Sequence, residues 1–193
     1  TRQVFEAWRD DTTAGLESLM LAPTKDLVVD LDTLAQHHRI STGQVTADGR
    51  GVLLSDGHHA WVGDVVVTRA NRRDLPVSRT DWVKNGDRWT ITGITTGGIQ
   101  VHHSRHHRTV TLPAWYVTAH VELGYAGTVH TAQGVTSDTV HGILTGREDR
   151  QLLYTMLTRG RRANHAYLDV LGDGSATILV SPEGRVPDKP TDV

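Results

Sequence analysis

The chain has 193 residues, of which 37% are hydrophobic and 22% charged, and its formal net charge is −2. This length predicts one domain, or one domain that carries a compact insertion. The sequence contains no cysteine, which excludes disulfides, thiolate zinc sites and a cysteine nucleophile and fits a reducing cytoplasm. It also lacks a long apolar run and a signal peptide, so we expect a soluble intracellular chain without a membrane partner.

The N-terminal part of the chain has the pattern of an α/β unit. Val4 and Trp8 follow helical spacing, and residues 18–22 predict a short buried strand. Thr24 can cap a second helix, in which apolar residues recur at the spacing of one helix face. A strand followed by a helix favours the α/β class.

Residues 45–115 predict a small all-β module, because short runs rich in Val, Ile, Thr and Trp alternate there with turn residues. The predicted features are a strand over 61–68, a hairpin turn at Asn85-Gly86 between 82–83 and 88–94, and a hairpin between 99–101 and 110–112. Five or so short strands favour a small barrel over an open sheet.

After the β module the α/β pattern returns. Residues 140–144 predict a strand, and Thr145 with Glu148 three residues later has the pattern of a capping box that opens a helix. Gly160 is placed to end that helix, and residues 164–171 predict a further strand. The β module is therefore inserted within an α/β domain.

A segment rich in glycine and threonine, residues 124–138, is the first candidate for chemistry. Its three glycines permit close approach of the backbone. Free amides, together with Thr128, His130 and Thr131, can hold a phosphate. An ordinary surface loop has the same composition, so this segment alone does not assign a function.

The second candidate is Arg159, at the end of the predicted amphipathic helix. A guanidinium there can neutralise charge that develops on a phosphoryl group during transfer. A purely structural interpretation also exists, because arginine is favoured near helix C-termini by the helix dipole.

Together, the two segments resemble motifs V and VI of superfamily 1 DNA helicases. The resemblance is closest to the RecD-like branch and to the helicase part of TraA/TraI/TrwC-type conjugative relaxases, with patterns similar to GYA-x-TVH-x-AQG-x-T-x-D at 124–138 and LY-x-x-x-TRGR-x-x-N at 153–164. Residues 62–66 and 83–87 also resemble the SH3-like barrel that these enzymes insert in their second RecA-like domain, and 19–40 resembles motif IV.

The resemblance implies a RecA-like P-loop helicase second motor domain, domain 2A, over 1–44 and 116–171. The inserted SH3-like β barrel, domain 2B, would cover 45–115, and 172–193 would be a partly disordered tail. The implied function is the C-terminal motor-domain fragment of an ATP-dependent DNA helicase or translocase, as in the helicase part of a conjugative relaxase. Its place would be the cytoplasm of a bacterium or plasmid host.

The resemblance also assigns site residues. Arg159 would be the catalytic arginine finger that reaches the γ-phosphate of ATP across the cleft between two RecA-like domains. The other implied residues are Gln133, Gly134 and Thr136 for ATP, and Thr128, His130, Thr131, Asn71 and Arg72 for single-stranded DNA. Thr136 stands where relatives often carry a glutamate, and Asp32 stands where motif IV usually has asparagine.

The sequence contains no Gly-x4-Gly-Lys-Ser/Thr and no Asp-Glu pair, which in relatives hold the phosphates, magnesium and water. We therefore expect that this chain alone does not hydrolyse ATP. ATP and Mg²⁺ would be bound mainly by a first RecA-like domain upstream in the same polypeptide.

A noncatalytic nucleic-acid-binding module is the first alternative. Residues 69–108 contain eight Arg or Lys and three Asp, a balance that suits phosphate contacts. Four tryptophans offer stacking surfaces, although two or three of them are expected in the barrel core: Trp61, Trp82, Trp89 and Trp115.

A metal-dependent nickase or zinc protein is the second alternative, suggested by the doublets His102-His103 and His106-His107. Adjacent side chains near a hairpin point to opposite faces and converge poorly on one ion. We therefore predict no metal ligands in this chain.

Overall fold

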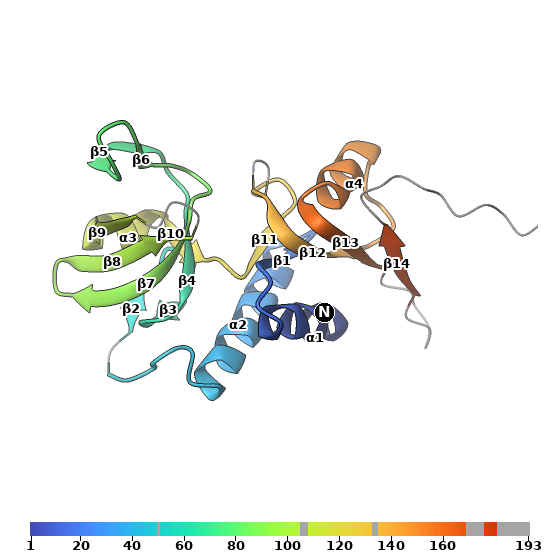
Figure 1. The fold of residues 1–193 in the computed structure, drawn as a ribbon, viewed down its shortest axis with the longest axis horizontal. Coiled ribbons are helices and arrows are strands. Elements are labelled where there is room, and N and C mark those ends of the chain that lie inside the picture. Colours follow the sequence, from blue (N-terminus) through green and yellow to red (C-terminus); the bar gives the residue numbers. More distant parts are fainter. Residues whose placement is uncertain (50, 105–107, 133–134, 169–175, 181–193) are drawn as a thin grey trace, which may run out of the picture. The chain divides into compact units, whose positions relative to one another are not determined.

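The computed structural model describes residues 1–49, 51–104, 108–132, 135–168 and 176–180 (Figure 1). The chain divides into two compact units, one formed by Thr1–Pro23 with Thr128–Val193 and the other by Thr24–Gly127. Among the helices of the described residues, none combines the length and the apolar character needed to cross a membrane.

The first unit is built on a mostly parallel sheet with the strand order β11-β1-β12-β13-β14. The strands of this sheet and the helices of the unit are α1 (Arg2–Thr13), β1 (Ser18–Ala22), β11 (Ala126–Thr128), β12 (Ser137–Leu144), α4 (Arg150–Leu157), β13 (Gly160–Leu168) and β14 (Ala176–Val180). The first two residues of β11 fall within the range of the other unit. β12 pairs in parallel with β1 and β13, and α4 forms the connection from β12 to β13. The α/β class predicted from the sequence is confirmed.

Helices α1 and α4 cover opposite faces of this sheet. Val140 in β12 belongs to a core cluster with Leu21 of β1 and Met156 of α4. The next residue, His141, places Nε2 2.7 Å from a carboxylate oxygen of Asp11 in α1. Because successive side chains of a strand point to opposite faces, α4 packs on one face and α1 on the other.

Close packing of α4 on β12 depends on a glycine. A Cβ on Gly142 would lie 2.0 Å from the sulfur of Met156, which is fully buried. Because Gly142 has no side chain, α4 can pack close to β12. Arg159 lies two residues after the end of this helix.

The second unit contains a five-stranded antiparallel sheet with the order β10-β4-β7-β8-β9 and two small hairpins, β2-β3 and β5-β6. Its elements are α2 (Lys25–Ser41), β2 (Val52–Leu53), β3 (His59–Ala60), β4 (Val65–Thr68), β5 (Arg72–Pro76), β6 (Trp82–Val83), β7 (Arg88–Thr95), β8 (Gly98–His103), β9 (Thr109–Pro113), α3 (Ala114–His120) and β10 (Val121–Leu123). The predicted hairpin between 99–101 and 110–112 is confirmed by the pairing of β8 with β9.

The tryptophans of this unit differ in burial. Trp89 is fully buried beside Ile91 and Val101, whereas Trp115 is 50% exposed. Trp61 and Trp82 are half-buried. The expectation that two or three of these tryptophans fill the core is therefore correct for Trp89 alone.

Helix α2 buries two polar side chains, Asp32 and Gln36, on the same face as Leu31 and Ala35. The Oδ1 atom of Asp32 accepts hydrogen bonds from the amides of Tyr125 at 3.0 Å and Ala126 at 2.8 Å. Burial, opposed by the bond from Ala126, raises the pKa of Asp32 to about 7. A side chain of α2 therefore holds the backbone at the start of the 124–138 segment.

A second buried carboxylate, Asp64, completes this connection. It accepts hydrogen bonds from the Tyr125 hydroxyl at 2.6 Å and from the Gln36 side chain at 2.8 Å. Burial raises the pKa of Asp64, and the bond from Tyr125 opposes this rise. Through these bonds, α2, the turn before β4 and the 124–126 backbone form one hydrogen-bonded network.

Two predictions for the β-rich segment are wrong. The strand predicted over 61–68 begins only at Val65, because Asp64 accepts a bond from the Trp61 amide and the positive φ of Gly63 (+99°) turns the chain. The strand before Asn85-Gly86 pairs with β5 instead of β7. The amide of Gly86 donates to the carbonyl of Thr68 at 2.7 Å, which directs this turn toward the end of β4.

The start of α4 also differs from the prediction. Thr145 and Glu148 do bond to each other, at 2.6 and 2.7 Å. The helix nevertheless begins at Arg150, with Asp149 as its N-cap accepting from the Leu152 amide at 2.7 Å. The predicted capping pair therefore closes the turn that precedes the helix.

The compact units and the predicted domain boundaries fall at different residues. The predicted β domain covers 45–115, whereas the β-rich unit covers Thr24–Gly127. The hydrogen bonds of Asp32 and Gln36 account for the inclusion of α2 in that unit. In the predicted tail, 176–180 form β14, and 172–175 and 181–193 lie outside the described residues.

Asp32→Asn tests the buried carboxyl. The folded protein holds a proton on Asp32 between about pH 4 and about pH 7 that the unfolded chain releases, so this group's contribution to stability falls as pH rises through that window. Asparagine keeps the Oδ1 acceptor and cannot ionise. We expect the free energy of unfolding of the variant, relative to the original chain, to rise by up to about 4 kcal/mol across the window.

Urea unfolding at several pH values measures this difference. Asp30→Asn is the control, because Asp30 is an exposed residue of the same helix. A difference between D32N and the original chain that stays constant with pH would contradict the assignment.

Candidate functional site

A tight turn over residues 128–132 presents two of the predicted side chains to solvent. The Thr128 carbonyl accepts from the Thr131 hydroxyl and the Ala132 amide, both at 3.0 Å. Val129 and Ala132 point into the core cluster of the first unit. His130 and Thr131 are exposed, so burial of their two neighbours fixes the backbone that carries them.

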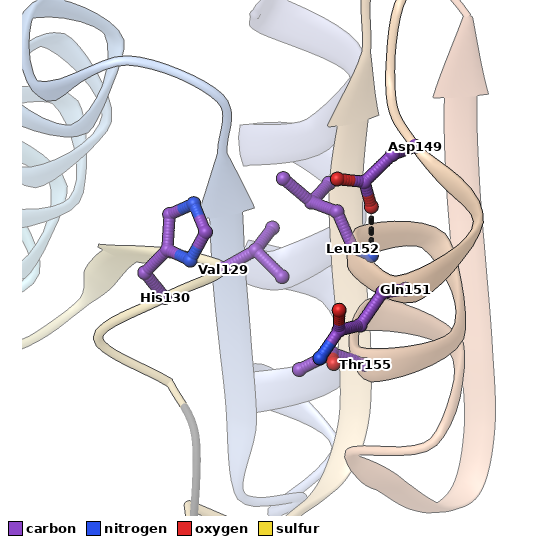
Figure 2. A pocket seen from close by; sticks show the side chains of 6 residues that line it. All are labelled: Val129, His130, Asp149, Gln151, Leu152 and Thr155. Atoms are coloured by element: carbon purple, nitrogen blue, oxygen red, sulfur yellow. Dashed lines mark hydrogen bonds between the residues drawn. The ribbon is translucent and has the colours of Figure 1, made fainter.

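A pocket of about 140 Å³ lies between this turn and the first part of α4. Figure 2 shows Val129 and His130 on one side and Asp149, Gln151, Leu152 and Thr155 on the other. An imidazole, an amide and a hydroxyl thus border one small hollow, although Asp149 is already engaged as the helix cap. The 128–132 turn and α4 are therefore neighbours on the same unit.

Arg159 follows α4, and its guanidinium folds back on the end of that helix. Nε donates to the Thr155 carbonyl at 3.1 Å, and a terminal nitrogen donates to the Thr158 hydroxyl at 3.2 Å. The residue is half-buried, and within the described part of the chain no carboxylate pairs with it. Its charge therefore remains available to an anionic ligand.

The next two arginines, by contrast, are engaged by Asp138. Arg161 lies 3.2 Å from the Asp138 carboxylate and 3.1 Å from Glu17, and Arg162 lies 3.7 Å from Asp138. Asp138 also accepts from the Glu17 amide at 3.0 Å. The bond from Glu17, with a further contribution from Arg161, lowers the pKa of Asp138. Asp138 therefore links the ends of the two candidate segments.

The predicted site residues do not all belong to one compact unit of the described chain. Gln133 and Gly134 lie outside the described residues, and Thr136 is half-buried. Asn71 and Arg72 belong to the other compact unit.

Both residues of that unit have local partners. The Asn71 side chain accepts from the Asn85 amide at 3.0 Å. Arg72 forms two hydrogen bonds to Asp74, at 2.8 and 2.6 Å, and lies 4.5 Å from the Trp115 ring centre. Arg72 thus joins a strand to an exposed aromatic ring.

The described histidines do not converge on one ion. His103 is buried against Trp89 and lies 3.7 Å from Asp87. His106 and His107 lie outside the described residues. Among the residues that the structure does describe, no group of three His, Cys, Asp or Glu is arranged to hold a metal.

Sequence reasoning gave no role to three polar residues that organise the site. Asp32 holds the 125–126 backbone, Asp138 pairs with two arginines, and Asn164 bonds to the residue that follows Arg159. Asp32 interrupts an apolar helix face, and Asp138 and Asn164 lie within the recognised patterns. In the sequence, only the positions of these three residues point to a role. Their hydrogen-bonding and ionic partners become apparent only in the folded structure.

Comparison with known proteins identifies relatives of the chain. The family model described as the UvrD-like helicase C-terminal domain matches residues 123–165. An uncharacterised protein of Mycobacterium tuberculosis is 33% identical over 129 residues, which cover 61% of this chain and 68% of the mycobacterial protein. The region matched by the family model includes both candidate segments, 124–138 and 153–164.

Two further similarities concern longer proteins. The conjugal transfer protein TraA of Agrobacterium fabrum is 26% identical over 162 residues, covering 83% of this chain and 14% of TraA. The crystal structure of the Pif1 helicase from Bacteroides, in complex with ADP-AlF3 and single-stranded DNA, matches with 15% identity and a TM-score of 0.52. That match covers 75% of this chain and 38% of Pif1 and indicates a shared fold.

Asp138→Asn tests the link between the two segments. The variant keeps an acceptor for the Glu17 amide but loses the charge that pairs with Arg161 and Arg162. Because both arginines are largely exposed, we expect the free energy of unfolding to fall by at most about 1 kcal/mol near neutral pH. Because the pKa of Asp138 is lowered in the fold, the difference should vanish as pH falls and the carboxylate protonates.

Thermal unfolding of D138N and of Glu17→Gln provides the measurement. Within the part of the chain that the structure describes, the Glu17 carboxylate pairs with Arg161 alone, so E17Q should lose less stability than D138N. Equal losses, or a D138N effect that persists in acid, would count against the central role of Asp138.

Proposed function

Because this chain belongs to the C-terminal domains of superfamily 1 helicases, we propose that it is the second RecA-like motor domain of an ATP-dependent DNA helicase. In this proposal the chain supplies an arginine finger and contacts to single-stranded DNA. The conjugal transfer proteins among its relatives support a place in the helicase region of a conjugative relaxase. The chain spans 14% of those proteins, so the activity of a whole relaxase is part of the proposal.

The contrast between Arg159 and its neighbours carries the proposal. Arg161 and Arg162 are paired with Asp138, whereas Arg159 donates only to a carbonyl and a hydroxyl within the described residues. Neutral acceptors hold a guanidinium less strongly than a carboxylate does. A phosphate that approaches Arg159 can therefore displace them.

This chain has only some of the groups that are needed to bind ATP and Mg²⁺. Arg159 offers a positive charge for a phosphate, but the sequence has no phosphate-binding Gly-x4-Gly-Lys-Ser/Thr loop. Among the described residues, no cluster of carboxylates is arranged for a metal. The cradle for the nucleotide would come from a first RecA-like domain of the same polypeptide, and Arg159 would stabilise the charge on the transferred phosphoryl group.

Single-stranded DNA is the proposed partner of the 128–132 turn. The exposed His130 and Thr131 stand on a backbone fixed by two buried residues, and they border the same helix that Arg159 follows. A shift of α4 on nucleotide binding would therefore reach the DNA contacts. Gln133, Gly134 and Thr136 remain proposed nucleotide neighbours.

The proposed domains keep the boundaries given above: domain 2A over 1–44 and 116–171, and an SH3-like domain 2B over 45–115. Four antiparallel strands within these bounds, paired in the order β4-β7-β8-β9, support the barrel proposal. The edge strand β10 and most of the short helix α3 lie beyond residue 115.

A noncatalytic nucleic-acid-binding module is the second candidate. The mycobacterial relative is close to this chain in size, since 129 matched residues make up 68% of it. Trp115 is 50% exposed with the Arg72 guanidinium beside it, and a base can stack on such a ring. In this case Asn71 and Arg72 would contact DNA without any ATP turnover.

Arg159→Ala separates the two candidates. In the polypeptide that contains the ATP-binding domain, we expect kcat for DNA-stimulated ATP hydrolysis to fall at least about a hundredfold. The affinity for a single-stranded oligonucleotide should stay within about twofold, because Arg159 acts on the phosphoryl group. A coupled ATPase assay and fluorescence anisotropy measure the two quantities.

Arg162→Ala is the matched control, because this nearby arginine is 66% exposed and, among the residues described, its ionic contact is the one to Asp138 at 3.7 Å. Its kcat should remain close to that of the original protein. ATP turnover that survives in R159A would overturn the helicase proposal. DNA binding that is lost in Trp115→Ala, in a protein without ATPase activity, would support the second candidate.

A further inference from the structure

The backbone of Arg159 is held on both sides of its α-carbon. On one side lies the end of α4, whose last residue is Leu157. On the other, the Arg159 carbonyl accepts a hydrogen bond from the Ser137 amide at 3.0 Å. Ser137 is the first residue of β12 and belongs to the 124–138 segment, so the two candidate segments meet at Arg159 itself.

Asn164 fixes the peptide that follows. Its Oδ1 accepts from the Gly160 amide at 2.7 Å, and its Nδ2 donates to the Gly160 carbonyl at 3.2 Å. Asn164 is only 2% exposed. The buried Asn164 side chain therefore bonds to both the amide and the carbonyl of Gly160. Loss of this side chain would leave these two backbone groups without that partner.

Only glycine at position 160 permits this arrangement. A Cβ there would lie 2.0 Å from the Ala163 carbonyl oxygen and 2.9 Å from Oδ1 of Asn164. Such a backbone contact cannot be relieved by a side-chain rotation. Gly160 and Asn164 thus hold the irregular first part of β13, residues 160–164, which we call the 160–164 clasp and which directly follows Arg159.

The side chain of Arg159 is held less firmly than its backbone. It donates to the Thr155 carbonyl at 3.1 Å and the Thr158 hydroxyl at 3.2 Å. Both are neutral acceptors at the end of one short helix. The guanidinium can therefore move by side-chain rotation alone, while the clasp keeps its α-carbon in place.

We infer that Asn164 is a positioning residue for Arg159, because the 160–164 clasp fixes the point from which the guanidinium reaches a nucleotide phosphate. This inference rests on the proposed function of Arg159. A misplacement of about 1 Å in a reacting group can cost about a hundredfold in rate. A buried side chain that holds a backbone at two atoms is suited to prevent such a misplacement.

Hydrogen exchange in this chain measures the positioning directly. In Asn164→Ala, the Gly160 amide and the Ser137 amide, which donates to the Arg159 carbonyl, should exchange at least about tenfold faster by NMR. Asn164→Asp keeps the acceptor for the Gly160 amide and should restore protection of that amide. Leu21→Val, a core change on β1 away from the clasp, should leave both signals protected. Unchanged exchange of the Ser137 amide in N164A would overturn the inference.

Kinetics of the polypeptide with its ATP-binding domain provide the second test. N164A should lower kcat about tenfold to a hundredfold, with KM for ATP and DNA affinity within about twofold of the original. In an Arg159→Ala background, N164A should have no further effect on kcat. Equal losses in N164A and L21V, or additive losses in the double variant, would overturn the positioning role. A normal rate in R159A alone would instead remove the proposed function.

Discussion

The hydrogen bond between the Ser137 amide and the Arg159 carbonyl joins the two segments on which the account depends. It lies at the start of the parallel pairing of β12 and β13, where Ser137 is paired with Gly160. Parallel strands bring residues that are far apart in sequence to the same edge of a sheet. Here that edge carries Arg159, whose guanidinium has no carboxylate partner among the described residues. The Asn164 bonds to Gly160 then restrict the chain just beyond it. A flexible, charged side chain thereby stands on a firmly held backbone.

Aspartate side chains serve the same purpose in each unit, and of these Asp32 and Asp64 are buried while Asp138 is half-buried. In the β-rich unit, Asp32 and Asp64 hold the backbone and the side-chain hydroxyl of Tyr125, at the start of the 124–138 segment. In the α/β unit, Asp138 near the end of that segment binds two arginines and the Glu17 amide. Each of these side chains satisfies groups from distant parts of the chain. Removal of Asp32 or Asp64 would leave buried donors unpaired, whereas removal of Asp138 would release two arginines that are 49% and 66% exposed. The exposed His130 and Thr131 lie between these two fixed ends.

Local patterns predicted the elements well and their partners poorly. The strand Ser18–Ala22 and the Thr24 cap of α2 agree with the sequence, because burial and capping depend on neighbouring residues. The turn at Asn85-Gly86 is present, but the predicted pairing is wrong, since a bond to Thr68 decides it. Asp32 has partners 93 and 94 residues away, which no periodicity reveals. Arg159 was found through its motif, whereas Asn164 gained a role only from the fold.

The most direct test of the account observes Arg159 while nucleotide binds. In the polypeptide with its ATP-binding domain, the NMR signal of the Arg159 Nε–H reports whether the side chain leaves the Thr155 carbonyl. We predict that this signal shifts when ADP with aluminium fluoride and single-stranded DNA are both bound, while the Gly160 amide stays protected. Nucleotide binding with an unchanged Arg159 signal would contradict the assignment of this residue as the arginine finger.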